Sequence, residues 1–164
     1  MNESNYFGDA TTREVQQDPH PLHHACSNGA SKEVVSLLLS KWPDAIKKKD
    51  RDKATPLHCA CSNGASVDVV SLLLSVWPDA IKERDNECQI PLHRLCSNGE
   101  SEEVVSLLLS KWPDGIKETD LENCTPLHCA CMWHASKEVV SLLLSSWPDA
   151  MRERERLGLI HTTS

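Results

Sequence analysis

The chain has 164 residues and a formal net charge of −7 at pH 7, with 40% hydrophobic and 25% charged residues, which excludes a protein that is disordered throughout. The negative charge argues against nucleic-acid binding, which requires a clustered basic surface. Apolar runs such as Leu37–Leu39 are far shorter than the roughly 18 residues of a membrane-spanning helix, so we expect no membrane segment.

Residues 1–18 contain no apolar core of the kind that a signal peptide has. We expect them to form a disordered N-terminal tail. The absence of a secretory signal predicts an intracellular protein, in the cytoplasm or the nucleus.

From residue 19 the sequence repeats every 35 residues without insertion or deletion, as units 19–53, 54–88, 89–123 and 124–154. Each unit carries one proline and one tryptophan of the pattern: Pro21, Pro56, Pro91 and Pro126, and Trp42, Trp77, Trp112 and Trp147. A unit this short cannot bury a core alone, so the units must stack on one another. The last unit is as apolar as the others. It is therefore either capped by the tail at 155–164 or open to weak self-association of an otherwise monomeric chain.

Each unit begins with a short helix. In the second unit Thr55 can cap it, Pro56 takes the first helical position, and Gly64 follows its end at Ser62. In the third unit Ile90 stands where Thr55 does, so its helix lacks a side-chain cap. We therefore expect Ile90→Thr to stabilise the array by about 1 kcal/mol.

A second helix follows in each unit. Ser66 can cap it, and it runs through an apolar series to Trp77, where Pro78 ends it. A short turn at 78–81 and a polar hairpin or loop at 82–90 complete the unit, and no segment alternates as a strand does.

This pattern resembles the ankyrin repeat through Thr55-Pro56-Leu57-His58-x-Ala60, Asn63-Gly64, Asp68-Val69-Val70 and Leu72-Leu73-Leu74. The resemblance covers residues 20–154 and implies an all-α solenoid of four helix–turn–helix repeats joined by short hairpin loops. The tetratricopeptide repeat, the other helical candidate, has no match to its Trp, Gly and Tyr spacing.

Two further features follow from the resemblance. It implies that the signature histidines hydrogen-bond the backbone and are structural, namely His23, His58, His93 and His128. The recurring prolines and tryptophans are likewise expected to be structural. The hairpin glycine of the family falls at Lys53, Cys88 and Asn123, which predicts a distorted turn.

Eight cysteines and eight histidines raise the question of a metal site. Cys59 and Cys61 point to different sides of a helix, and His58 with Cys61 supplies only two ligands. Equivalent positions of stacked helices are about 8–10 Å apart, too far for a shared zinc or a disulfide. We therefore predict no metal, no cofactor and reduced, buried thiols, with Cys88 and Cys124 in the hairpins as the most reactive.

The serine and histidine residues recur in every unit, whereas a catalytic group should be singular, and no phosphate loop or hydrolase motif is present. We therefore predict a non-catalytic scaffold or adaptor that binds a protein or peptide through its concave face. Two alternatives remain, namely a regulatory ankyrin module of a larger effector protein and a thiol-based redox or metal sensor.

The resemblance implies that a partner binds the hairpin tips and the ends of the first helices. Met132 and Trp133 replace the Ser-Asn of the other units, and aromatic side chains are enriched in interface cores. Arg94 replaces a cysteine and is expected to read a carboxylate of the partner. The other candidate residues of this surface are Asn63, Asn86, Glu87, Ser97, Asn98 and Glu122.

Overall fold

The computed structural model describes residues 20–98 and 101–150, and over these ranges the chain is helical without strands. The first helices are α1 (Pro21–Ser27), α3 (Pro56–Ser62), α5 (Pro91–Asn98) and α7 (Pro126–Met132). The second helices are α2 (Lys32–Lys41), α4 (Val67–Val76), α6 (Glu102–Lys111) and α8 (Lys137–Ser146). The all-α repeat fold predicted from the sequence is confirmed. The expected tails, at 1–18 and 155–164, lie outside the described residues.

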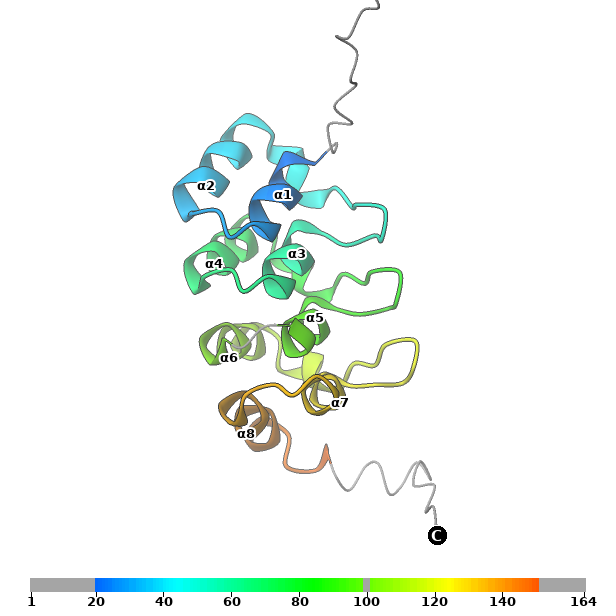
Figure 1. Ribbon diagram of the computed structural model, residues 1–164. Coiled ribbons are helices and arrows are strands. Elements are labelled where there is room, and N and C mark those ends of the chain that lie inside the picture. Colours follow the sequence, from blue (N-terminus) through cyan, green and yellow to red (C-terminus); the bar gives the residue numbers. More distant parts are fainter. Residues whose placement is uncertain (1–19, 99–100, 151–164) are drawn as a thin grey trace, which may run out of the picture.

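The helices form two parallel columns (Figure 1). The first helices stack on one another in one column, the second helices stack in the other, and the hairpin loops project from the side of the first helices. Valine and leucine side chains of the second helices fill the space between the columns, with Val70, Leu73 and Val105 fully buried. None of the helices in the described ranges is long and apolar enough to cross a bilayer.

The predicted helix boundaries are present. The Ser66 hydroxyl accepts a hydrogen bond from the Val69 N–H at 3.4 Å, and Gly64 ends α3 with φ of 67°. Pro78 starts a short 3₁₀ helix, η2 (Pro78–Lys82), and the same element recurs as η1 (Pro43–Lys47) and η3 (Pro113–Lys117). The tryptophan before each proline ends the second helix and is half-buried, except Trp42, which is 56% exposed.

The hairpin turns are not distorted, contrary to the sequence prediction. Lys53, Cys88 and Asn123 adopt φ of 58°, 57° and 58°, the left-handed conformation that glycine provides in the family. An aspartate at the start of each hairpin supports this conformation. In the second hairpin the Asp85 Oδ1 accepts hydrogen bonds from the N–H groups of Glu87 and Gln89, both at 2.9 Å. Side-chain hydrogen bonds to the loop backbone therefore offset the strain of a non-glycine residue.

The signature histidine ties each unit to the next. Nδ1 of His58 accepts a hydrogen bond from the Thr55 N–H at 3.2 Å, so Nε2 carries the hydrogen and donates to the Gln89 carbonyl of the following hairpin at 3.0 Å. His23 and His93 reach the equivalent carbonyls, those of Ala54 and Cys124. The structural role implied by the resemblance is thus present in three consecutive units.

Ion pairs also join neighbouring units in one direction. Lys49 of the first unit contacts Glu83 of the second at 2.6 Å, and Arg84 of the second pairs with Glu118 of the third. The members of each pair occupy equivalent places in the repeat, since Lys49 and Arg84 are 35 residues apart, as are Glu83 and Glu118. All four side chains are about one-third exposed, so each pair contributes little to stability by itself.

The end units expose residues that the inner units bury. Val34 and Leu37 are exposed on the first unit, whereas Val69, the counterpart of Val34, is buried. On the fourth unit Leu144 is exposed, and its counterpart Leu109 is buried. This difference follows from the stacking, because each of these positions packs against a neighbouring unit.

The first unit has an unsatisfied polar atom. His20 occupies the position of Thr55, and Nδ1 of His23 is buried without a hydrogen-bond partner. In the second and fourth units the threonine hydroxyl lies 2.9 Å and 2.8 Å from the corresponding Nδ1. A buried polar atom without a partner is destabilising. We therefore expect the first unit to be less stable than the second and fourth units, whose sequences are similar but carry a threonine here.

His20→Thr should therefore raise the free energy of unfolding by about 1 kcal/mol, because it gives the His23 Nδ1 a partner and caps α1. The same change at Ile90 is the matched control. The sequence alone predicts that Ile90→Thr stabilises the array, but Ile90 is 1% exposed, so the change also removes buried apolar surface. This change removes about two buried carbon groups at about 0.8 kcal/mol each, which more than offsets the cap's gain of about 1 kcal/mol. Urea unfolding of both variants measures the difference, and equal stabilisation by both would contradict it.

Acid should weaken the array through the same histidines. Burial lowers the pKa of His23, His58 and His93, although their hydrogen bonds to backbone carbonyls oppose the shift. The unfolded chain then binds more protons below its ordinary histidine pKa of about 6.5. The contribution of these histidines to the free energy of unfolding is therefore complete above about pH 6.5. It is lost as the pH falls below that value toward their lowered pKa in the folded chain. Urea midpoints between pH 8 and pH 5 test this, and a flat profile from pH 6.5 to pH 5 would contradict it.

Candidate functional site

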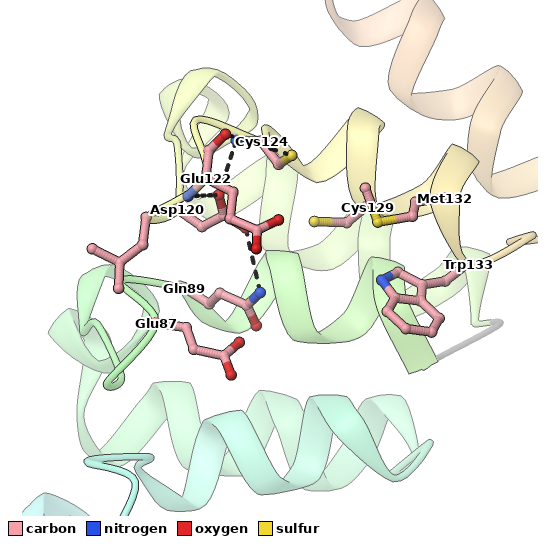
Figure 2. Close-up of a pocket in the computed structure, with 9 residues that line it drawn as sticks. Glu87, Gln89, Asp120, Glu122, Cys124, Cys129, Met132 and Trp133 are labelled. Atoms are coloured by element: carbon pink, nitrogen blue, oxygen red, sulfur yellow. Dashed lines mark hydrogen bonds between the residues drawn. The ribbon is translucent and has the colours of Figure 1, made fainter.

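A pocket of about 290 Å³ opens on the hairpin side of the fourth unit (Figure 2). It lies between the second and third hairpins and the end of α7. Its walls combine carboxylates, sulfur-containing side chains and one indole: Glu87, Gln89, Asp120, Leu121, Glu122, Cys124, Cys129, Met132 and Trp133. The structure thus brings together Glu87, Glu122, Met132 and Trp133, four residues of the partner-binding surface that the sequence predicts.

Trp133 is the main apolar surface of the pocket. Trp133 is 62% exposed, and its backbone N–H donates to the Cys129 carbonyl where α7 ends. His134 follows with φ of 57°, where Gly64 has φ of 67° in the second unit. A left-handed histidine is more strained than glycine. The fourth unit therefore keeps the backbone of the repeat while it presents a large aromatic side chain to solvent.

Asn63, the counterpart of Trp133, has a local structural use. Its side-chain amide donates to the Cys59 carbonyl at 2.9 Å, and Asn28 makes the same bond to His24 at 2.8 Å. An indole in place of Asn63 cannot donate this side-chain bond, and in the fourth unit the equivalent Cys129 carbonyl accepts from the backbone N–H of Trp133 at 3.0 Å. The presence of Trp133 therefore removes a helix-end hydrogen bond and leaves an apolar surface.

Other candidate residues also bond within the chain. The Ser97 hydroxyl donates to the His93 carbonyl at 3.0 Å, and the Asn86 amide donates to the Arg51 carbonyl of the previous hairpin at 3.2 Å. Asn98 is the last residue of α5 and is exposed. Neither Asn98 nor the two donors, Ser97 and Asn86, line the pocket.

Arg94 does not face a partner in this structure. Its guanidinium pairs with Asp85 at 2.7 Å, and the Asp85 side chain is fully buried. The sequence predicts that Arg94 reads a carboxylate of the partner, and the structure corrects this, because the carboxylate belongs to the chain's own hairpin. Sequence reasoning missed Asp85, although an aspartate recurs at this place as Asp50 and Asp120.

The rim of the pocket is acidic. Glu87 and Glu122 are exposed at neighbouring hairpin tips, and the tips are joined by a hydrogen bond from the Leu121 N–H to the Glu87 carbonyl at 3.0 Å. Asp120 is half-buried between them, with Oδ1 accepting from the Glu122 and Cys124 N–H groups, both at 2.9 Å. Among the described residues that line the pocket there is no lysine or arginine, and the charged ones, Glu87, Asp120 and Glu122, are all acidic.

The cysteines differ in how deeply they are buried. Cys26, Cys61 and Cys96 are buried, and burial raises the pKa of all three thiols, that of Cys26 to about 12. Cys131, their counterpart in the fourth unit, is exposed, whereas the hairpin residues Cys88 and Cys124 are half-buried. The sequence predicts that the two hairpin thiols are the most reactive, and the structure shows that both are less exposed than Cys131. Exposure of Cys131 comes from its place in the last unit, where no further repeat covers it.

Two findings bear on metal binding. Over residues 20–98 and 101–150, no three side chains among His, Cys, Asp and Glu gather as metal ligands would. Burial raises the pKa of Cys129, the pocket thiol, to about 11, which disfavours the thiolate that a metal requires.

Alkylation should follow this order of exposure. Brief treatment with iodoacetamide should modify Cys131 first and leave Cys26, Cys61 and Cys96 unmodified until denaturant is added, because both exposure and thiolate formation limit the reaction. Peptide mass spectrometry of timed samples measures the order. Early modification of Cys61 in the folded protein would contradict the burial described above.

The family model for ankyrin repeats (three copies) matches residues 6–80 and 78–153. A search of curated proteins gave no significant match.

Proposed function

The chain belongs to the ankyrin-repeat family, whose repeats generally mediate protein–protein interactions, and we propose that it is a non-catalytic scaffold or adaptor that binds a protein or peptide through its hairpin side. The observation that carries this proposal is the exposed Trp133 in an acidic pocket of the last unit. The partner is a segment with an apolar side chain flanked by basic residues.

The apolar part of this surface supports an anchor for the partner. Trp133, Met132 and Leu121 are exposed large apolar side chains, and all three line the same pocket. Tryptophan is the side chain most enriched among interface residues that dominate binding energy. By contrast, Trp42 is nearly as exposed but lies at the end of α2, on the column of second helices.

The charged part supports the choice of partner. Glu87, Asp120 and Glu122 lie across the pocket from the apolar anchor, and none of the described lining residues is basic. Such a rim attracts a basic segment before contact and speeds association, whereas the desolvated anchor slows dissociation. The overall charge of −7 adds to this attraction at low ionic strength.

Trp133→Ala should weaken binding of a peptide selected against the wild-type chain from a random library. We expect a loss of about 2 kcal/mol or more, roughly 30-fold, mainly through faster dissociation. Trp42→Ala is the matched control, because it removes an equally exposed indole from a different face, and it should leave binding unchanged. Biolayer interferometry gives both rates. Selected peptides that bind both variants as well as the wild type would refute the hairpin-side site.

A further inference from the structure

The repeat provides an internal comparison for the pocket, because the third unit carries arginine where its neighbours carry cysteine. Arg94 corresponds to Cys59 and Cys129 at intervals of 35 residues. Both Nε and one terminal nitrogen of Arg94 lie 2.7 Å from Oδ2 of Asp85. The structure thus shows how a guanidinium sits against the hairpin aspartate at this place in the repeat.

The fourth unit keeps the aspartate but lacks the arginine. Asp120 is the counterpart of Asp85 and supports its hairpin through Oδ1 in the same way. Its Oδ2 has a hydrogen bond from the Gln89 amide at 3.4 Å, and no ion pair of Asp120 with lysine or arginine occurs among the described residues. Cys129 is much shorter than arginine, and both Cys129 and Asp120 line the pocket.

We propose that this pocket binds an arginine side chain of the partner, whose guanidinium pairs with Asp120 as that of Arg94 pairs with Asp85. The inference rests on the protein-binding function proposed above and names the residue that the pocket recognises. At about 290 Å³ the pocket is at the lower limit of small-molecule sites, which are about 300–1,000 Å³, and this suits one long side chain.

The remaining walls favour arginine over lysine. Figure 2 shows Met132 and Trp133 on one side of the pocket and the acidic residues on the other. An arginine that enters between them places its aliphatic stem against the thioether and indole while its guanidinium reaches the carboxylate. The planar guanidinium can stack on an aromatic face while two of its nitrogens donate to one carboxylate oxygen, as those of Arg94 do to Oδ2 of Asp85, which the ammonium group of lysine cannot do.

The first hairpin has the same aspartate and cysteine but not the same surroundings. Asp50 and Cys59 are the counterparts of Asp120 and Cys129. Next to Asp50 the hairpin carries Arg51 and Lys53, which repel a cation, and no tryptophan replaces the asparagine at the end of α3. Within residues 20–98 and 101–150, the pocket of the fourth unit therefore combines an aspartate that has no internal arginine partner with an aromatic wall, and the first hairpin does not.

Binding of two short peptides to the full chain tests this proposal. The probes are acetyl-Leu-Arg-Leu-amide and its citrulline analogue, which has the same shape without the charge. The readout is the indole N–H signal of Trp133 in a ¹H–¹⁵N spectrum, assigned with Trp133→Phe. We expect the arginine peptide to shift this signal and to bind at least tenfold more tightly than the citrulline peptide. Equal binding of the two peptides would overturn the proposal, as would equally tight binding of acetyl-Leu-Lys-Leu-amide, in which lysine replaces the arginine.

Two variants of the pocket sharpen the test. Cys129→Arg copies Arg94 and should fill the site from within, so that peptide binding is lost while the circular dichroism spectrum is kept. Asp120→Asn retains the Oδ1 acceptor of the hairpin and should weaken the arginine peptide at least tenfold. The matched control is Cys59→Arg, the same change two units away, which should leave binding unchanged. Unchanged binding to Cys129→Arg would overturn the proposal.

Failure of the arginine site is distinguishable from failure of the proposed function. Library-selected peptides that lose binding with Trp133→Ala but not with Cys129→Arg would overturn the arginine site and retain the hairpin-side function. The chain's own residues 151–164 include Arg152, Arg154 and Arg156. Peptide binding that appears only after all three are changed to glutamine would overturn the assignment to a partner and give the pocket to this segment.

Discussion

The hydrogen bond from the signature histidine of each of the first three units to the next hairpin is the constraint on which the array depends. His58 holds the start of its own helix through Nδ1 and the following unit through Nε2, so one buried ring sets both the local and the long-range geometry. A unit that shifts along its neighbour leaves a buried nitrogen and a buried carbonyl without partners, which is costly in a low-dielectric interior. This accounts for the constant 35-residue interval between equivalent positions of the units.

Because the stacking is so regular, the exceptions carry the functional information. The hairpins and helix ends of all units occupy equivalent places, and a change of side chain at one of them alters the surface without altering the backbone. Trp133 and His134 illustrate this, since the backbone of the fourth unit keeps the left-handed turn although the glycine is gone. Cys129 illustrates the reverse case, in which a shorter side chain than that of Arg94 leaves space next to an aspartate.

The sequence predicts most of the fold, because caps, prolines and apolar periodicity are local signals that recur four times. It predicts the apolar and acidic components of the pocket because Trp133 departs from the repeat. It does not predict that Arg94 pairs with Asp85, since the two residues are joined by a turn whose shape depends on Asp85 itself. It also misses the exposure of Cys131, which depends on the absence of a neighbouring unit and not on the residue or its surroundings in the sequence.

The ion pairs between units give the solenoid an electrical direction. Each basic residue, Lys49 or Arg84, faces a glutamate of the unit that follows, so the series reads base to acid from the N-terminal to the C-terminal end. Lys48 occupies the glutamate position in the first unit and breaks this rule. A second array that approached this end with a basic residue in the usual place would meet a like charge. At the N-terminal face this position therefore lacks the carboxylate that accepts the basic residue of the preceding unit elsewhere in the array.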